Sequence, residues 1–90
     1  MTLADIGNWR GVVRFMASQG AVDGRAYVRG QDVGDTVEGA GVQTVRALVR
    51  RGMVATGEPV PTPGQPRRRT DVYTLDTRDS RVRMVMEAME

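Results

Sequence analysis

Residues 44–57, TVRALVRRGMVATG, predict the end of a basic helix that passes directly into a β-strand. Val45, Leu48 and Gly52 follow one another at helical spacing. Arg50 falls in the last turn, where a positive side chain interacts favourably with the helix dipole. Gly52 suits the left-handed position that ends many helices, and β-prone residues follow it at once. This stretch therefore predicts a helix followed directly by a strand, and the rest of the expected fold is built around this pair.

The start of this helix is expected at residues 35–38, DTVE. Asp35 at the N-cap and Glu38 reaching back to it match a capping arrangement. The pattern therefore predicts one helix over residues 35–52. The face opposite its apolar stripe carries short, amide or arginine side chains and no acid: Ala40, Gln43, Arg46, Ala47 and Arg50.

Two β-strands and a basic loop are expected after the helix, over residues 53–76. Tyr73 and Leu75 share one face of the second strand, because side chains alternate along a strand. Between the strands, residues 59–70 hold all four prolines of the chain and three consecutive arginines. Prolines are rare inside strands, so this segment is predicted to be a loop of restricted conformation.

An amphipathic helix is expected near the N-terminus. Thr2 and Asp5 resemble a capping box, and apolar residues then recur at steps of three and four. We expect Trp9 to lie in the core, because its spacing matches the rest of that stripe. The stripe consists of Ile6, Trp9, Val13 and Met16.

The remaining segments give weaker patterns. Residues 24–30, GRAYVRG, predict a short strand, and residues 31–34, QDVG, predict at most one helical turn. The last expected helix covers residues 77–90. Its apolar side chains can pack on the N-terminal helix or form a homodimer, and the sequence leaves both open. These side chains are Val82, Val85, Met86 and Met89.

The composition argues against catalysis. The 90 residues include no histidine, cysteine or lysine, and all thirteen basic residues are arginine. The usual general bases, thiol nucleophiles, Schiff-base lysines and soft metal ligands are therefore missing. We expect no enzyme activity, no metal, no cofactor and no small-molecule ligand. A single domain without a signal peptide or a span of about 20 apolar residues predicts a cytoplasmic protein with no membrane contact.

Positive charge is concentrated in one part of the chain. Residues 40–70 carry six arginines and one acid, a net charge of +5, whereas the rest carries a net charge of −3. Such polarity in a small domain favours an anionic partner. A chance cluster of solvated surface charge is the alternative.

The order of elements, with TVRALVRRGMVATG and residues 67–76, RRRTDVYTLD, resembles a winged helix-turn-helix domain. The MarR, GntR and PadR types have a recognition helix that ends in a similar pattern, here Leu48, Gly52, Met53 and Val54. The resemblance implies an α+β fold: a three-helix core, a small antiparallel β wing and here a C-terminal helix. The second helix of that fold, expected near residues 31–38, is weakly encoded, because glycines flank its few apolar residues.

The resemblance also implies that residues 35–52 are a recognition helix for double-stranded DNA. Gln43, Arg46, Ala47 and Arg50 would face base edges in the major groove. Thr44 and Arg51, at the flank, suit phosphates. The wing arginines, Arg67, Arg68 and Arg69, would contact the backbone or a narrow minor groove.

A small bacterial or phage transcriptional regulator is the expected role. Two alternatives stay open. One is a winged-helix protein-interaction module, such as an assembly subunit or a phage-encoded inhibitor, because a fold does not fix a function. The other is a DNA-binding accessory factor in replication, partition or recombination.

Overall fold

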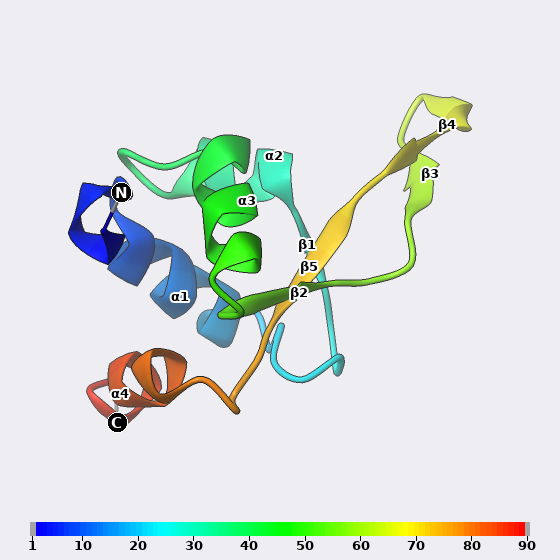
Figure 1. Ribbon diagram of the computed structural model, residues 1–90. Coiled ribbons are helices and arrows are strands. Elements are labelled where there is room, and N and C mark those ends of the chain that lie inside the picture. Colours follow the sequence, from blue (N-terminus) through cyan, green and yellow to red (C-terminus); the bar gives the residue numbers. More distant parts are fainter. Residues whose placement is uncertain (1, 90) are drawn as a thin grey trace.

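The computed structural model describes residues 2–89 and combines α-helices with a small antiparallel sheet (Figure 1). The predicted α+β class is therefore confirmed. A 3-10 helix precedes α1, and a two-stranded arm of β3 and β4 leaves the main sheet. The bounds are Leu3–Asp5 for the 3-10 helix, then α1 Trp9–Ser18, β1 Val28–Arg29, α2 Gly30–Thr36, α3 Val42–Arg50, β2 Val54–Thr56, β3 Val60–Thr62, β4 Gln65–Thr70, β5 Val72–Leu75 and α4 Ser80–Glu87.

The main sheet has the strand order β1-β5-β2, with both pairs antiparallel. Val28 lies opposite Tyr73 in one pair, and Val54 lies opposite Leu75 in the other. All four residues of the central strand β5 are buried. The sheet therefore joins a segment before α2 to the strands that flank the arm.

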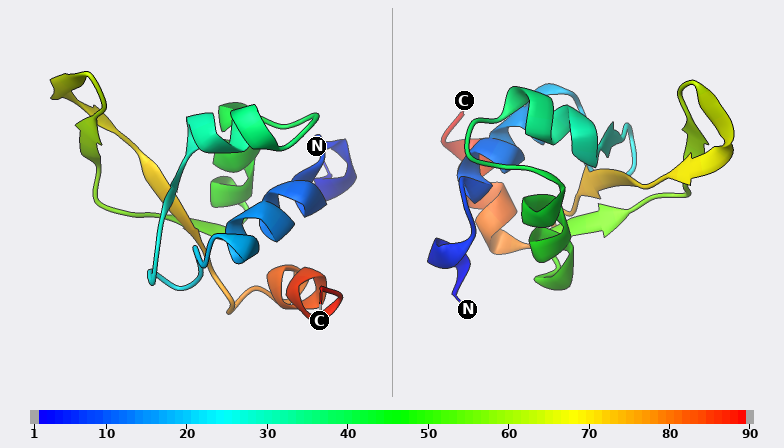
Figure 2. Two further views of the ribbon diagram at one scale, coloured as in Figure 1. Left: turned by 180° about the vertical axis from the view of Figure 1, so that it is seen from behind. Right: turned by 90° about the horizontal axis from the view of Figure 1, so that it is seen from above.

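The core lies between the helices and this sheet, and the arm projects from the body at the end opposite α4 (Figures 1 and 2). Trp9 is only 8% exposed, which confirms the prediction that it belongs to the core, and Tyr73 on β5 is only 3% exposed. The largest completely buried side chains are Met16, Leu48, Met53, Leu75, Val12, Val13, Val33, Val45 and Val82.

The N-terminal helix begins later than its apolar stripe predicts. Thr2 caps only the 3-10 turn, where its backbone N–H donates to Asp5 Oδ2 at 2.9 Å. Asn8, in the left-handed conformation with φ of 38°, then caps α1 by accepting a hydrogen bond from the Gly11 N–H. Between the 3-10 helix and α1 the chain passes close to the loop before α3, since a Cβ on Gly7 would lie only 2.8 Å from the carbonyl oxygen of Gly39.

The helix predicted over residues 35–52 is wrong at its start. Asp35 lies in α2, not at an N-cap, and α3 begins only at Val42 after a loop. The chain turns there because Gly39 adopts a positive φ of 78°.

The weakly predicted second helix is in fact two turns long. Val33 and Val37, the residue directly after α2, are both buried, and their burial favours α2 over the local capping pattern. Gly30, at its start, allows close packing, since a Cβ there would lie 2.6 Å from the Val42 side chain.

The last helix also starts later than predicted, at Ser80, because Asp79 is the N-cap and accepts from the N–H of Arg81 at 2.8 Å. The helix lies against α1. Val82 and Val85 are buried within the chain, Met86 is half-buried and Met89 is 43% exposed. Packing on the chain itself therefore accounts for the first two, and Glu90 lies outside the described residues. A homodimer stays a prediction that depends on the exposed methionines.

Two aspartates near the start of α4 make the stability of the fold sensitive to acid. Hydrogen bonds from the Arg78 side chain and backbone lower the pKa of Asp76 to about 2, and the Arg81 side chain lowers the pKa of Asp79. Because both folded-state pKa values lie below the ordinary 3.8, the unfolded chain takes up protons first. Their stabilising contribution is complete above about pH 4 and is lost as the pH falls towards about 2.

We therefore expect urea unfolding to give a falling free energy over that interval. Asp76→Asn should reduce the stability at pH 7 and flatten the dependence, because its charge no longer changes. Asp71→Asn serves as the matched control, since that exposed carboxylate accepts no hydrogen bond within residues 2–89. Equal pH profiles for the wild-type protein and Asp76→Asn would contradict this assignment.

Candidate nucleic-acid interface

Helix α3 presents a mostly polar outer surface. Gln43, Arg46 and Arg50 are exposed, whereas Ala47 is half-buried against the core. Val45 and Leu48 are completely buried and fix the rotation of the helix. Gln43, Arg46 and Arg50 therefore point outwards as predicted. The prediction is wrong for Ala40, which lies in the loop before α3 and, like Ala47, packs against the core.

Two of the predicted contact residues have other structural roles. Thr44 is half-buried, and its hydroxyl accepts a hydrogen bond from the Gly41 N–H at the start of α3. Arg51 is half-buried at the end of α3, where its carbonyl accepts from the Arg81 guanidinium at 3.0 Å. Both residues therefore take part in hydrogen bonds at the two ends of α3, and the phosphate contacts expected of them stay a prediction.

The segment predicted to be a loop over residues 59–70 is wrong in its secondary structure, because it forms the hairpin arm of β3 and β4. The Thr62 and Thr70 hydroxyls are 2.5 Å apart across the arm, and Gly64 turns the chain with a φ of 79°. A two-stranded arm leaves one edge of each strand unpaired, and prolines are tolerated at such edges. The loop prediction was wrong because it was based on proline content and took no account of the pairing that the flanking strands impose.

The pairing of β4 with β3 is irregular where two of the three arginines lie. Pro61 lies opposite Arg69 and Thr62 lies opposite Gln65, so residues 66–68 have no partner on β3. Extra residues of this kind bend a strand and redirect its side chains. Arg67, Arg68 and Arg69 are all exposed.

The base of the arm is held by β5 and by an aromatic ring. The Gly57 N–H donates to the Val72 carbonyl at 2.8 Å. The Tyr27 ring lies so close to Gly57 that a Cβ there would be 2.4 Å from it. The strand predicted over residues 24–30 includes Tyr27, but β1 contains only Val28–Arg29 and Tyr27 is 47% exposed. Tyr27 therefore packs against Gly57 at the base of the arm instead of extending the sheet.

A cleft of about 230 Å³ lies between α3 and the strands at the base of the arm. Asp71, which directly follows β4, is the acid in its lining and was missed by the sequence analysis. The signal in the sequence that could have identified Asp71 is its position directly after RRRT. The lining combines two guanidinium groups with one carboxylate: Arg46, Val49, Arg50, Thr56, Asp71 and Tyr73.

The arginines of the chain differ in how they are neutralised. Arg29, Arg78 and Arg81 each form a 2.7 Å ion pair with an aspartate two or three residues away. Within residues 2–89, no ion pair or hydrogen bond engages the side chains of Arg46, Arg50 and Arg67–Arg69. Guanidinium groups of this kind are available to an anion, and their planar donors match phosphate and base-edge acceptors. We call α3 and the arm together the basic face.

No family model, no curated protein and no solved structure matches this chain. Within the described residues, no helix is both long and apolar enough to cross a membrane. In the same part of the chain, no cluster of acidic side chains has the make-up of a metal site.

Proposed function

We propose that the protein is a sequence-specific binder of double-stranded DNA with a winged helix-turn-helix fold. The order α1, β1, α2, α3, β2, arm, β5 and the sheet order β1-β5-β2 are similar to that class. The observation that carries the proposal is the concentration of positive charge on the basic face. Five arginines without an acidic partner among the described residues lie on α3 and the arm: Arg46, Arg50, Arg67, Arg68 and Arg69.

In this proposal α3 enters the major groove, which is wide enough for an α-helix. Arg46 and Arg50 donate to guanine N7 and O6, and Gln43 bonds adenine, since these are the geometrically suited pairs. Ala47, half-buried and small, permits a close approach and meets a thymine methyl. Thr44 and Arg51 lie towards the flanking phosphates.

The arm supplies the second part of the contact. Its three arginines bind phosphates on either side of a neighbouring minor groove, and a narrow groove would attract them most strongly. Such contacts add affinity without reading bases directly. Pairing of β3 with β4 and the contact of Tyr27 with Gly57 restrict the arm before binding, which lowers the entropy lost on association. A role in transcriptional regulation fits this design.

Fluorescence anisotropy with a random duplex, at about 50 and about 200 mM salt, tests the proposal. We expect micromolar binding that weakens steeply with salt, as counterion release requires. Circular dichroism in the same buffers establishes that the protein is folded. A folded protein that binds no duplex at the lower salt would contradict the proposal and favour a protein-interaction module.

Single substitutions on α3 should change base preference. On a duplex enriched by selection, Arg46→Ala or Arg50→Ala should each cost about 1–3 kcal/mol and relax discrimination at one position. Arg14→Ala is the matched control, because Arg14 is exposed on α1 and is not part of the basic face. Competition titrations with single-base variants measure the effect. An unchanged base preference in both α3 variants would contradict major-groove reading by α3.

A further inference from the structure

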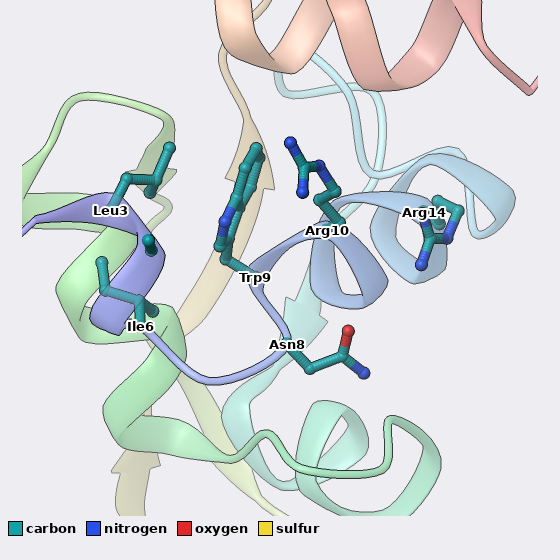
Figure 3. Close-up of a pocket in the computed structure, with 7 residues that line it drawn as sticks. Leu3, Ile6, Asn8, Trp9, Arg10 and Arg14 are labelled. Carbon is teal, nitrogen blue, oxygen red and sulfur yellow. The ribbon is translucent and has the colours of Figure 1, made fainter.

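A second surface lies where α1 meets α4, away from the arm (Figures 1 and 2). A hollow of about 260 Å³ between these helices is lined by Trp9, Arg10, Arg14, Met84, Val85, Ala88 and Met89. A second hollow, of about 550 Å³, lies on the side of the 3-10 helix and shares Trp9, Arg10 and Arg14. Figure 3 shows the indole of Trp9 between Leu3 and Ile6 on one side and Arg10 on the other. We call the residues around the first hollow the α1/α4 face.

The floor of this face is apolar and includes two exposed methionines. Met84 is 58% exposed and Met89 is 43% exposed, and both stand beside the buried Val85. Among the described residues only five large hydrophobic side chains are exposed, so the presence of two around one hollow is a concentration. Methionine adapts its shape to different apolar groups and is common at surfaces that bind amphipathic helices.

The rim of the face is positively charged. Arg10 and Arg14 lie one helical turn apart on α1 and are exposed. The Arg10 guanidinium lies 4.8 Å from the centre of the Trp9 ring, which holds it beside the hollow. None of the lining residues is acidic, and no ion pair neutralises either arginine within residues 2–89.

We propose that the α1/α4 face binds an acidic amphipathic helix of a partner protein. One or two apolar side chains of that helix enter the hollow between Trp9 and the methionines, and its carboxylates pair with Arg10 and Arg14. An apolar anchor in a pocket with a complementary charged rim is the usual pattern of helix-in-groove recognition.

A second copy of this chain fits the face less well. A two-fold contact brings the same surface of both copies together. Here it would place two copies of Arg10 and Arg14 near one another without an acid among the lining residues. Juxtaposed like charges of this kind disfavour association. Charge complementarity therefore selects an acidic partner.

The face is separate from the basic face, because none of its lining residues belongs to α3 or the arm. The protein can consequently hold DNA and a partner at the same time. The inference does not depend on DNA binding, and its experiment needs no DNA.

The probe is a fluorescein-labelled peptide of about sixteen residues in which leucines recur every third or fourth position and glutamates fill the others. We expect anisotropy titrations at about 150 mM salt to give saturable binding. A peptide of the same composition, scrambled so that its leucines share no face, should bind at least about 10-fold more weakly, a difference of about 1.4 kcal/mol.

Variants locate the binding site. Arg14→Glu and Met84→Asp change exposed residues of the face and should each weaken binding of the peptide by about 10-fold or more. The Arg67→Ala, Arg68→Ala, Arg69→Ala variant, altered only on the arm, should bind it as the wild-type protein does. Circular dichroism checks that each variant is folded.

Three results would overturn the inference. Equal binding of the ordered and scrambled peptides would mean attraction by charge alone. Loss of binding in the arm variant would move the peptide to the basic face. In analytical ultracentrifugation, a concentration-dependent dimer that Met84→Asp abolishes would show that a second copy covers the face.

Discussion

Replacing Arg67, Arg68 and Arg69 together with alanine should weaken binding to every duplex without changing which sequence is preferred. The three side chains are exposed, and among the described residues no acid pairs with them. If each contacts a phosphate, the slope of log affinity against log salt should become less steep by about 0.9 per contact, or about 2.7 in all. Affinity at low salt should fall by about 10- to 100-fold, which corresponds to about 1.4–2.8 kcal/mol.

The fold should survive this change. The arm pairs only with itself beyond Gly57, and none of its three arginines packs on the core. Thermal unfolding of the variant should therefore match that of the wild-type protein. A lower DNA affinity with unchanged stability assigns the loss to the interface.

The matched control removes the same charge from elsewhere. Arg10→Ala, Arg14→Ala and Arg25→Ala together also lower the net charge by three, and all three arginines are exposed outside the basic face. This control should retain a steep salt dependence and an affinity close to that of the wild-type protein. If both triple variants lost affinity and slope equally, general electrostatic attraction would explain the binding, and the arm would have no specific role.

The sequence predicts best those parts of the fold in which local preference and burial agree. The second half of α3 is an example: Val45 and Leu48 are completely buried, and Gly52 adopts the positive φ expected of a residue that ends a helix. The same agreement explains why the strand VYTL and the core position of Trp9 were predictable. In each case the spacing of the apolar residues matches the periodicity of the helix or strand that forms.

The errors arise where a local signal competes with packing. The DTVE pattern satisfies a helix cap, but α2 runs through Asp35, and Val33 and Val37, the residue that follows α2, are buried in the core. The prolines of the arm indicate a loop only if strand pairing is ignored, and pairing is a non-local property. A single sequence carries no signal that weighs these contributions against each other.

The candidate site was predictable in its chemistry and less so in its detail. Exposure of Gln43, Arg46 and Arg50 follows from helical periodicity alone. The cleft that brings Asp71 beside Arg46 and Arg50 depends on how β5 returns beneath α3, which no local pattern encodes. The α1/α4 face could likewise not be predicted, because the sequence does not show which side of α4 packs on α1.

Trp9→Ala should produce the largest loss of stability among the substitutions considered. The indole is only 8% exposed and belongs to the main core cluster. Truncation of a buried tryptophan or phenylalanine to alanine costs about 3–5 kcal/mol, and a small domain has about 5–15 kcal/mol of stability in total. Urea unfolding followed by circular dichroism measures the change, because the variant lacks the only tryptophan of the chain.

Two comparison variants separate the core role of the ring from its contact with Arg10. Trp9→Phe keeps an aromatic group in the core and should cost clearly less than the alanine variant. Arg10→Ala removes the side chain whose guanidinium lies 4.8 Å from the centre of the ring, and should cost about 0.5–1 kcal/mol because that contact is exposed.

A loss of less than about 1 kcal/mol in Trp9→Ala would contradict the core assignment, since it would mean that little apolar area leaves the core with the ring. A large loss has a consequence for the α1/α4 face as well. The ring that supports the fold also forms one wall of the hollow next to Met84 and Met89. Weak peptide binding by Trp9→Ala would then report unfolding, so the face must be tested through Arg14 and Met84, whose exposed side chains can change without disturbing the core.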